Sequence, residues 1–171
     1  MHNIPEGPLD PKEEAICDAA YEGDVAELQR LIALGYPLVS EEHGSPMDFA
    51  ASEGEDEAVK LLHAAGAPVN GRNDDGYPVY WAVVNQRAST LSLLCYLGAD
   101  INACECEAVK EAVNCNDLDI MKIVVEVGGD LDVAVTQAKQ EENKEMEQYL
   151  WGQIALRDKD DRAVGIYPKH I

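Results

Sequence analysis

Four glycines recur at nearly constant intervals along this chain of 171 residues. Gly35, Gly66, Gly98 and Gly128 are 31, 32 and 30 residues apart, and each follows a run of apolar or helix-forming residues. Self-similarity with a period near thirty residues is the sequence signature of a solenoid, in which similar units stack on one another. This repeat constrains the fold more strongly than any other feature of the sequence.

The glycines allow four units to be superposed without gaps over sixteen residues, at 20–35, 51–66, 83–98 and 113–128. In each unit small or apolar residues end one short helix before a polar break, and apolar residues at helical spacing then continue to the glycine. A glycine in that place ends the second helix in a left-handed conformation. Stacked units of this kind predict an all-α solenoid of helix-turn-helix pairs joined by short extended loops. The small or apolar pairs are Ala19-Ala20, Ala50-Ala51, Ala82-Val83 and Ala112-Val113.

The segment 44–70, GSPMDFAASEG followed by EAVKLLHAAGAPVN, resembles an ankyrin repeat, whose pattern is roughly G-x-T-P-L-H-x-A-A-x-x-G, then V-x-L-L and G-A-D-V-N. The segment 76–102 matches again, whereas 107–110 reads EAVK and has lost the Thr-Pro motif. The resemblance covers about 15–151 and implies units at about 15–42, 43–74, 75–105, 106–132 and 133–151. An extended lead-in (1–14) and a C-terminal tail (152–171) are expected to flank them.

The charge is unusual, because 33 acidic residues stand against 13 basic ones and give a net charge of −20. Such a chain repels nucleic acid and anionic membranes and attracts a basic partner, although acidity that serves only solubility is the plain alternative. No apolar run approaches the roughly 18–20 residues of a membrane helix, and the first residues lack the basic and apolar regions of a secretory signal. We therefore expect a cytoplasmic protein that is monomeric by itself and has no membrane partner.

Residues for catalysis are sparse. No glycine-rich phosphate loop is present, and the four histidines are not paired at a spacing that suits a metal. The five cysteines indicate reduced thiols, since an odd count without a signal peptide does not suggest a disulfide framework. Four of them could in principle bind zinc, but they lack the paired knuckles of a structural site. We expect no catalytic residue, no metal and no cofactor; the four are Cys95, Cys104, Cys106 and Cys115.

The ankyrin resemblance implies protein binding through the hairpin tips and the exposed side of each first helix, where the concave surface of the family begins. Phe49 and Trp81 precede the small residues and are expected to pack in the core between helices. The tips and first helices supply acidic and hydrogen-bonding groups with a few tyrosines, which suit targets rich in Lys and Arg. The predicted contact residues are Tyr21, Glu22, Glu41, Glu42, Glu53, Asp74, Asp75, Tyr77, Tyr80, Asn85 and Glu105.

The sequence therefore predicts a non-enzymatic interaction module that binds and neutralises a basic protein, as an inhibitor or immunity protein does against a toxin such as a nuclease. This last step is an analogy within the family rather than a derivation. Three alternatives stay open: a nucleic-acid mimic that occupies a DNA- or RNA-binding protein, a general ankyrin scaffold, and a metal or thiol enzyme that uses the cysteines.

Overall fold

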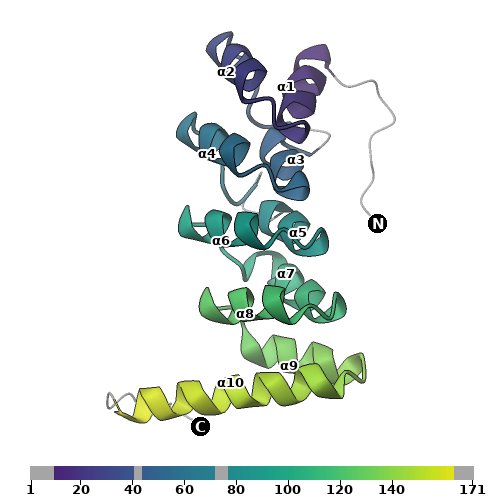
Figure 1. Cartoon of the computed structure of the whole chain (residues 1–171), viewed down its shortest axis with the longest axis vertical. Coiled ribbons are helices and arrows are strands. Elements are labelled where there is room, and N and C mark those ends of the chain that lie inside the picture. Colours follow the sequence, from purple (N-terminus) through teal and green to yellow (C-terminus); the bar gives the residue numbers. More distant parts are fainter. Residues whose placement is uncertain (1–9, 41–43, 72–76, 164–171) are drawn as a thin grey trace.

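The computed structural model describes residues 10–40, 44–71 and 77–163, which contain ten helices and no strand. The helices follow one another in pairs, and the pairs stack along one axis (Figure 1). They are α1 (Pro11–Tyr21), α2 (Val25–Ala33), α3 (Pro46–Glu53), α4 (Asp56–Ala64), α5 (Tyr77–Val84), α6 (Ala88–Tyr96), α7 (Ala103–Asn114), α8 (Leu118–Glu126), α9 (Leu131–Gln140) and α10 (Lys144–Ala163).

The helices form two columns. The odd-numbered helices α1, α3, α5, α7 and α9 pack against one another on one side, and α2, α4, α6 and α8 form the other side (Figure 1). Small buried side chains such as Ala20, Ala50 and Ala82 let the odd helices approach closely. The core runs between the columns, because each helix pair leaves an apolar face that only its neighbours cover. The predicted all-α solenoid is confirmed.

The recurring glycines end the second helix of each of the first four pairs. Gly35, Gly66, Gly98 and Gly128 have φ values of +76°, +97°, +101° and +88°, which confirms the predicted left-handed position. A side chain would be strained there, and glycine avoids that strain. The spacing of these glycines is therefore the spacing of the helix ends.

Asparagines that follow two of these glycines connect neighbouring units. The Asn70 side-chain oxygen accepts a hydrogen bond from the Asp100 backbone N–H at 2.7 Å, and that of Asn102 accepts one from the Asp130 N–H at 2.8 Å. The Asn102 amide nitrogen also donates to the Gly128 carbonyl at 3.0 Å. The repeated asparagine is therefore a link to the next unit, not only a loop residue.

The connection into unit four is shorter than the one before it. Six residues separate Asn70 from α5, but only four separate Asn102 from Glu107. Within these four, Cys104, Glu105 and Cys106 have φ values of 51°, 55° and 60°, so they form a left-handed turn before the right-handed part of α7. Three successive left-handed residues with side chains cost free energy, and the short connection imposes that cost.

The helices at both ends differ from the predicted bounds. Helix α1 begins at Pro11, inside the predicted lead-in, because the Asp10 side chain caps it by accepting the Lys12 N–H at 2.8 Å. Helix α10 continues to Ala163, past the predicted end of the last unit at residue 151. Its stripe of buried residues extends one helical turn beyond that end; they are Met146, Leu150 and Ile154. In the part of the chain that the structure describes, no helix is long and apolar enough to span a membrane.

Candidate protein-binding surface

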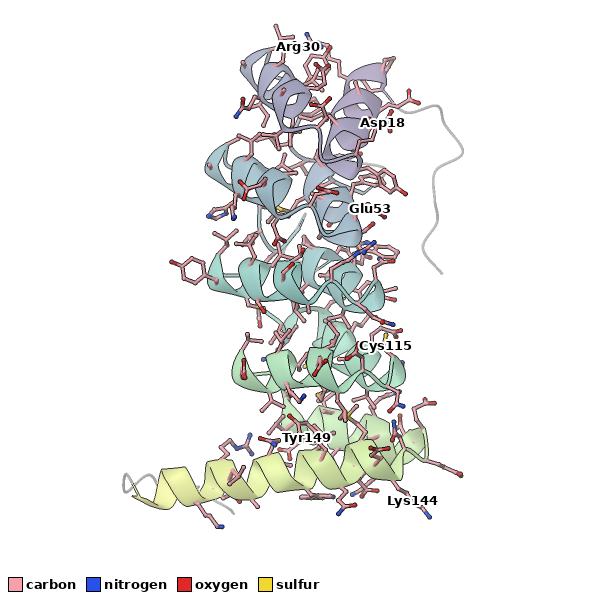
Figure 2. The ribbon with its side chains drawn as sticks, viewed as in Figure 1. Asp18, Arg30, Glu53, Cys115, Lys144 and Tyr149 are labelled. Atoms are coloured by element: carbon pink, nitrogen blue, oxygen red, sulfur yellow. The ribbon has the colours of Figure 1, made fainter. Side chains whose placement is uncertain are left out.

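The exposed side chains of α1, α3, α5, α7 and α9 form one continuous surface, which we call the inner face. These five helices carry nine acidic residues and three lysines, whereas α2, α4, α6 and α8 carry five acidic and three basic residues. Each basic residue of that second column forms an ion pair within its own helix, for example Arg30 with Glu27 at 2.6 Å. Asp18 and Glu53 come from the odd column, and Arg30 comes from the even one (Figure 2). The excess of negative charge in the paired helices is therefore concentrated in the odd column, and all of its acidic residues except the buried Asp48 are at least partly exposed.

Five of the predicted contact residues lie on or beside this face with side chains that are at least partly exposed. Tyr21 is 50% exposed at the end of α1, and Glu22 follows it in solvent. Tyr77 and Tyr80, on α5, are half-buried, and Tyr80 packs against the core. Burial, together with the nearby charges of Glu111 and Glu107, raises the pKa of Tyr80, so its phenol stays protonated at neutral pH. Glu105 lies exposed in the left-handed turn.

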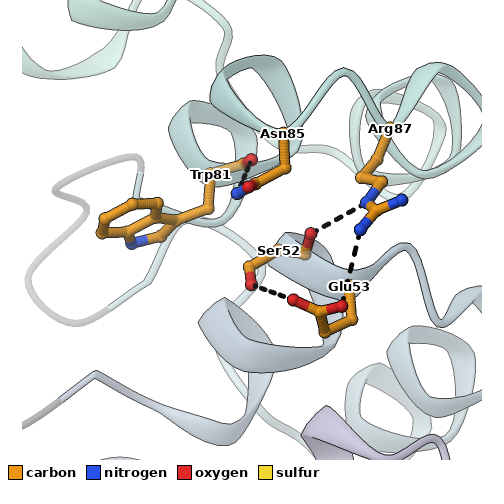
Figure 3. A network of polar contacts seen from close by, with 5 residues as sticks. All are labelled: Ser52, Glu53, Trp81, Asn85 and Arg87. Carbon is orange, nitrogen blue, oxygen red and sulfur yellow. Dashed lines mark hydrogen bonds and ion pairs between the residues drawn. The ribbon is translucent and has the colours of Figure 1, made fainter.

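Glu53 and Asn85 instead take part in contacts within the solenoid (Figure 3). The Arg87 Nε donates to the Ser52 carbonyl at 2.9 Å, and its Nη2 lies 3.4 Å from Glu53 Oε2. This arginine is the N-cap of α6, the second helix of unit three, and ties it to the end of α3 in unit two. The Asn85 Nδ2 donates to the Trp81 carbonyl at 3.0 Å within α5. Both predicted contact residues therefore have structural partners.

Four predicted contact residues, Glu41, Glu42, Asp74 and Asp75, lie outside the described residues. Their role stays a prediction from the sequence.

The prediction that Trp81 packs in the core was wrong, because its side chain is 40% exposed. Pro78, Val79, Ala82 and Val83 are the buried residues of this helix. Trp81 is two positions from both valines, which at 3.6 residues per turn directs it to the opposite side. Its ring meets the Tyr80 ring edge to face, with centroids 5.4 Å apart and an interplanar angle of 72°. The helical spacing around Trp81 was the signal that sequence reasoning missed.

Trp81 belongs to a line of equivalent positions that crosses the inner face. Each of them directly precedes a buried alanine of an odd helix; the alanines are Ala19, Ala50, Ala82, Ala112 and Ala138. We call this line the central row; it consists of Asp18, Phe49, Trp81, Glu111 and Gln137. Asp18 and Trp81 are exposed and the other three are half-buried. The central row therefore places two aromatic rings between two carboxylates.

A shallow hollow adjoins the central row between α7 and α9. Lys110, Asp132, Thr136 and Gln137 are among its lining residues, so it offers donors and acceptors of both charges. Lys110 is half-buried and lies next to Glu111 in the sequence, which lowers the local excess of negative charge. This mixture indicates a contact surface rather than a site for one anion or cation.

Four of the five thiols, those of Cys17, Cys95, Cys106 and Cys115, are poor candidates for nucleophiles or metal ligands. Burial raises the pKa of Cys17 to about 12 and that of Cys95 to about 11. Burial and nearby carboxylates also raise the pKa values of Cys106 and Cys115. Raised values keep a thiol protonated, whereas nucleophiles and metal ligands are thiolates. The described residues contain no group of three or more His, Cys, Asp or Glu side chains placed to hold a metal ion.

Comparison with known proteins identifies the repeat. A family model described as ankyrin repeats (3 copies) matches residues 16–105, which is more than half of the chain. No curated protein matches the chain. The matched region begins inside α1, covers the rest of the first three helix pairs and reaches the left-handed turn, where the fourth begins. The chain belongs to the ankyrin-repeat family, whose repeats form protein–protein interaction modules.

Proposed function

We propose that this chain is a non-enzymatic binding module that captures a basic protein on its inner face. The observation that carries the proposal is the uneven distribution of charge between the two columns of helices. The odd helices have three acidic residues for each basic one, and the basic residues of the even helices are already paired. Ankyrin repeats bind proteins, so this acidic face is a place for a protein of opposite charge.

Exposed charge of one sign accelerates encounter with a basic partner and selects against acidic ones. Because the attraction acts through solvent, salt weakens it: the screening length falls from about 10 Å at 0.1 M to about 3 Å at 1 M ionic strength. The exposed rings of Tyr21 and Trp81 add apolar contact area that salt does not screen. Binding is thus expected to weaken, but not to vanish, as salt rises.

In its specific form, the proposal is that binding neutralises the partner in the cytoplasm, as an inhibitor or immunity protein does for a nuclease toxin. A nuclease presents a basic surface to its anionic substrate, and an acidic module that covers this surface blocks it. A nucleic-acid mimic makes a different prediction, since it competes with duplex DNA for any protein that binds the phosphate backbone. Competition by generic duplex DNA across several unrelated DNA-binding proteins would favour the mimic.

The test is capture of partners from the native host with the tagged full chain, at low and at high salt. Two triple variants remove the same charge from different columns. The inner triple variant is Asp18→Asn, Glu22→Gln and Glu111→Gln, and the outer triple variant is Glu57→Gln, Asp119→Asn and Glu126→Gln.

We expect one basic protein to be captured at low salt, retained by the outer triple variant and lost by the inner one. The captured protein is then assayed for catalytic activity with and without the chain, and inhibition is the expected result. Equal loss of the partner by both triple variants would show that net charge alone matters, and would refute binding on the inner face. Full activity of the bound partner would refute neutralisation.

A further inference from the structure

We propose that Trp81 is the anchor of this surface, and that the partner segment has an apolar side chain at its centre and Lys or Arg at both ends. The inference rests on the proposed function, because it takes the inner face as the binding surface. It goes further by assigning different tasks to different parts of the central row. The observation behind it is the order of side chains along that row: a carboxylate, two rings, and a carboxylate.

Trp81 has the properties of an energetic anchor. It is a large side chain that is 40% exposed on a regular helix, so it offers contact area to a partner from a rigid support. The Tyr80 ring packs against it edge to face, with the ring centroids 5.4 Å apart. A ring already held in place loses little entropy on binding, and tryptophan is enriched among residues that dominate interface energy.

Phe49 widens the apolar part of the row. It occupies the position equivalent to Trp81 on the neighbouring helix α3 and is half-buried. Packed helices lie about 8–10 Å apart, so an apolar side chain of moderate size contacts both rings from between them. The centre of the row therefore favours an apolar group over a second charge.

The two carboxylates mark the ends of the partner segment. Asp18 is on α1 and Glu111 on α7, three units apart, which at about 8–10 Å per unit gives a separation of about 24–30 Å. Extended chain advances about 3.3 Å per residue, so about seven to nine residues span this distance. Glu111 accepts a hydrogen bond from Asn114 Nδ2 at 3.1 Å, which orients its carboxylate and leaves acceptor capacity for a cation.

The experiment uses three synthetic peptides of about eleven residues, long enough to span the row when extended. The first has Lys-Arg pairs at both ends and Leu-Phe at the centre, the second has the same ends with Ser-Gly at the centre, and the third has Glu pairs at the ends with Leu-Phe at the centre. Labelled peptide is titrated with the full chain, and binding is followed by fluorescence anisotropy. Trp81→Ala is compared with Tyr96→Ala, which removes a ring that is 87% exposed on α6 of the other column.

A second readout tests directly whether the apolar centre of the first peptide lies against the Trp81 ring. The chain has two tryptophans, so Trp151→Phe leaves Trp81 as the only one. Emission from Trp81 is expected to shift when the first peptide binds and to stay unchanged with the second. Circular dichroism of each variant establishes that the helices are intact before binding is compared.

The expected result is that the first peptide binds most tightly, that Trp81→Ala weakens its binding about tenfold or more, and that Tyr96→Ala has no effect. Equal binding of both basic peptides, with no effect of Trp81→Ala, would overturn the anchor and leave the proposed function standing. If neither basic peptide binds better than the acidic one, both the anchor and the basic partner fall.

Discussion

The Glu105→Gly variant is expected to be more stable than the Glu105→Ala variant. At Glu107 the order is expected to be reversed, with Glu107→Gly less stable than Glu107→Ala. Glu105 has a φ of 55° in the middle of the left-handed turn, and Glu107 begins the right-handed part of α7. Both side chains are exposed, and both substitutions remove one carboxylate. The comparison of glycine with alanine at one position therefore isolates the backbone term.

The magnitude follows from two opposing contributions at Glu105. A residue with a Cβ in the left-handed region costs about 1–2 kcal/mol. Glycine removes this strain but loses about 0.5–1 kcal/mol more conformational entropy on folding. Glu105→Gly is thus expected to be more stable than Glu105→Ala by about 0.5–1 kcal/mol. At Glu107 only the entropy term remains, and Glu107→Gly should be less stable than Glu107→Ala by about 0.5–1 kcal/mol.

The assay is urea unfolding of the four variants, followed by far-UV circular dichroism. Both pairs are measured on the full chain under one set of conditions, so differences within a pair cancel the shared loss of charge. If glycine were no better than alanine at Glu105, the left-handed turn would not carry the strain that its dihedral angles imply. A loss at Glu105 as large as that at Glu107 would show that the turn is right-handed in solution.

Three further predictions concern the core, the links between units and the thiols. Met47→Ala, at a fully buried position, is expected to lower the free energy of unfolding by about 2–5 kcal/mol, and Leu34→Ala, 59% exposed, by less than about 0.5 kcal/mol in the same urea assay. Asn102→Ala removes two hydrogen bonds between units and Asn70→Ala removes one, and each bond contributes about 0.5–1.5 kcal/mol. Asn102→Ala is therefore expected to lower the free energy of unfolding more than Asn70→Ala does, and equal losses would contradict the role of these side chains as links. Burial raises the pKa of the Cys17 thiol from the ordinary value of 9.0 to about 12. The unfolded chain therefore releases this proton at a lower pH than the folded chain, and the free energy of unfolding falls as pH rises from 9 to 12. Unfolding measured across this range should show a smaller decline for Cys17→Ala than for the unmodified chain, and identical declines would refute the shift.

Local rules made much of the fold predictable from sequence. The glycine spacing located the ends of the second helices, because a chain that leaves a helix in the left-handed conformation favours glycine. Small or apolar pairs such as Ala50-Ala51 located the last turn of each first helix, just before the polar break. Each of these depends on the residue itself and its near neighbours along the chain.

The candidate surface was predictable only in part. The alignment already placed Phe49 and Trp81 at the same repeat position, but Trp81 was assigned to the core because the ankyrin resemblance puts that position between the helices. That Glu53 is held by Arg87 depends on a contact between residues 34 positions apart, which no local pattern shows. Its availability to a partner could not be judged before that contact was known.

The sequence by itself determined the period, the helix pairs and the acidic character of this protein, since glycine conformation, helical spacing and charge are properties of short stretches of chain. The tertiary structure decided which side of each helix faces solvent, the left-handed turn into unit four and the continuation of α10 past residue 151. These depend on how neighbouring units fit together. A residue such as Ile154 becomes part of the core only because α9 lies beside it, and packing against another element is what the linear pattern does not contain.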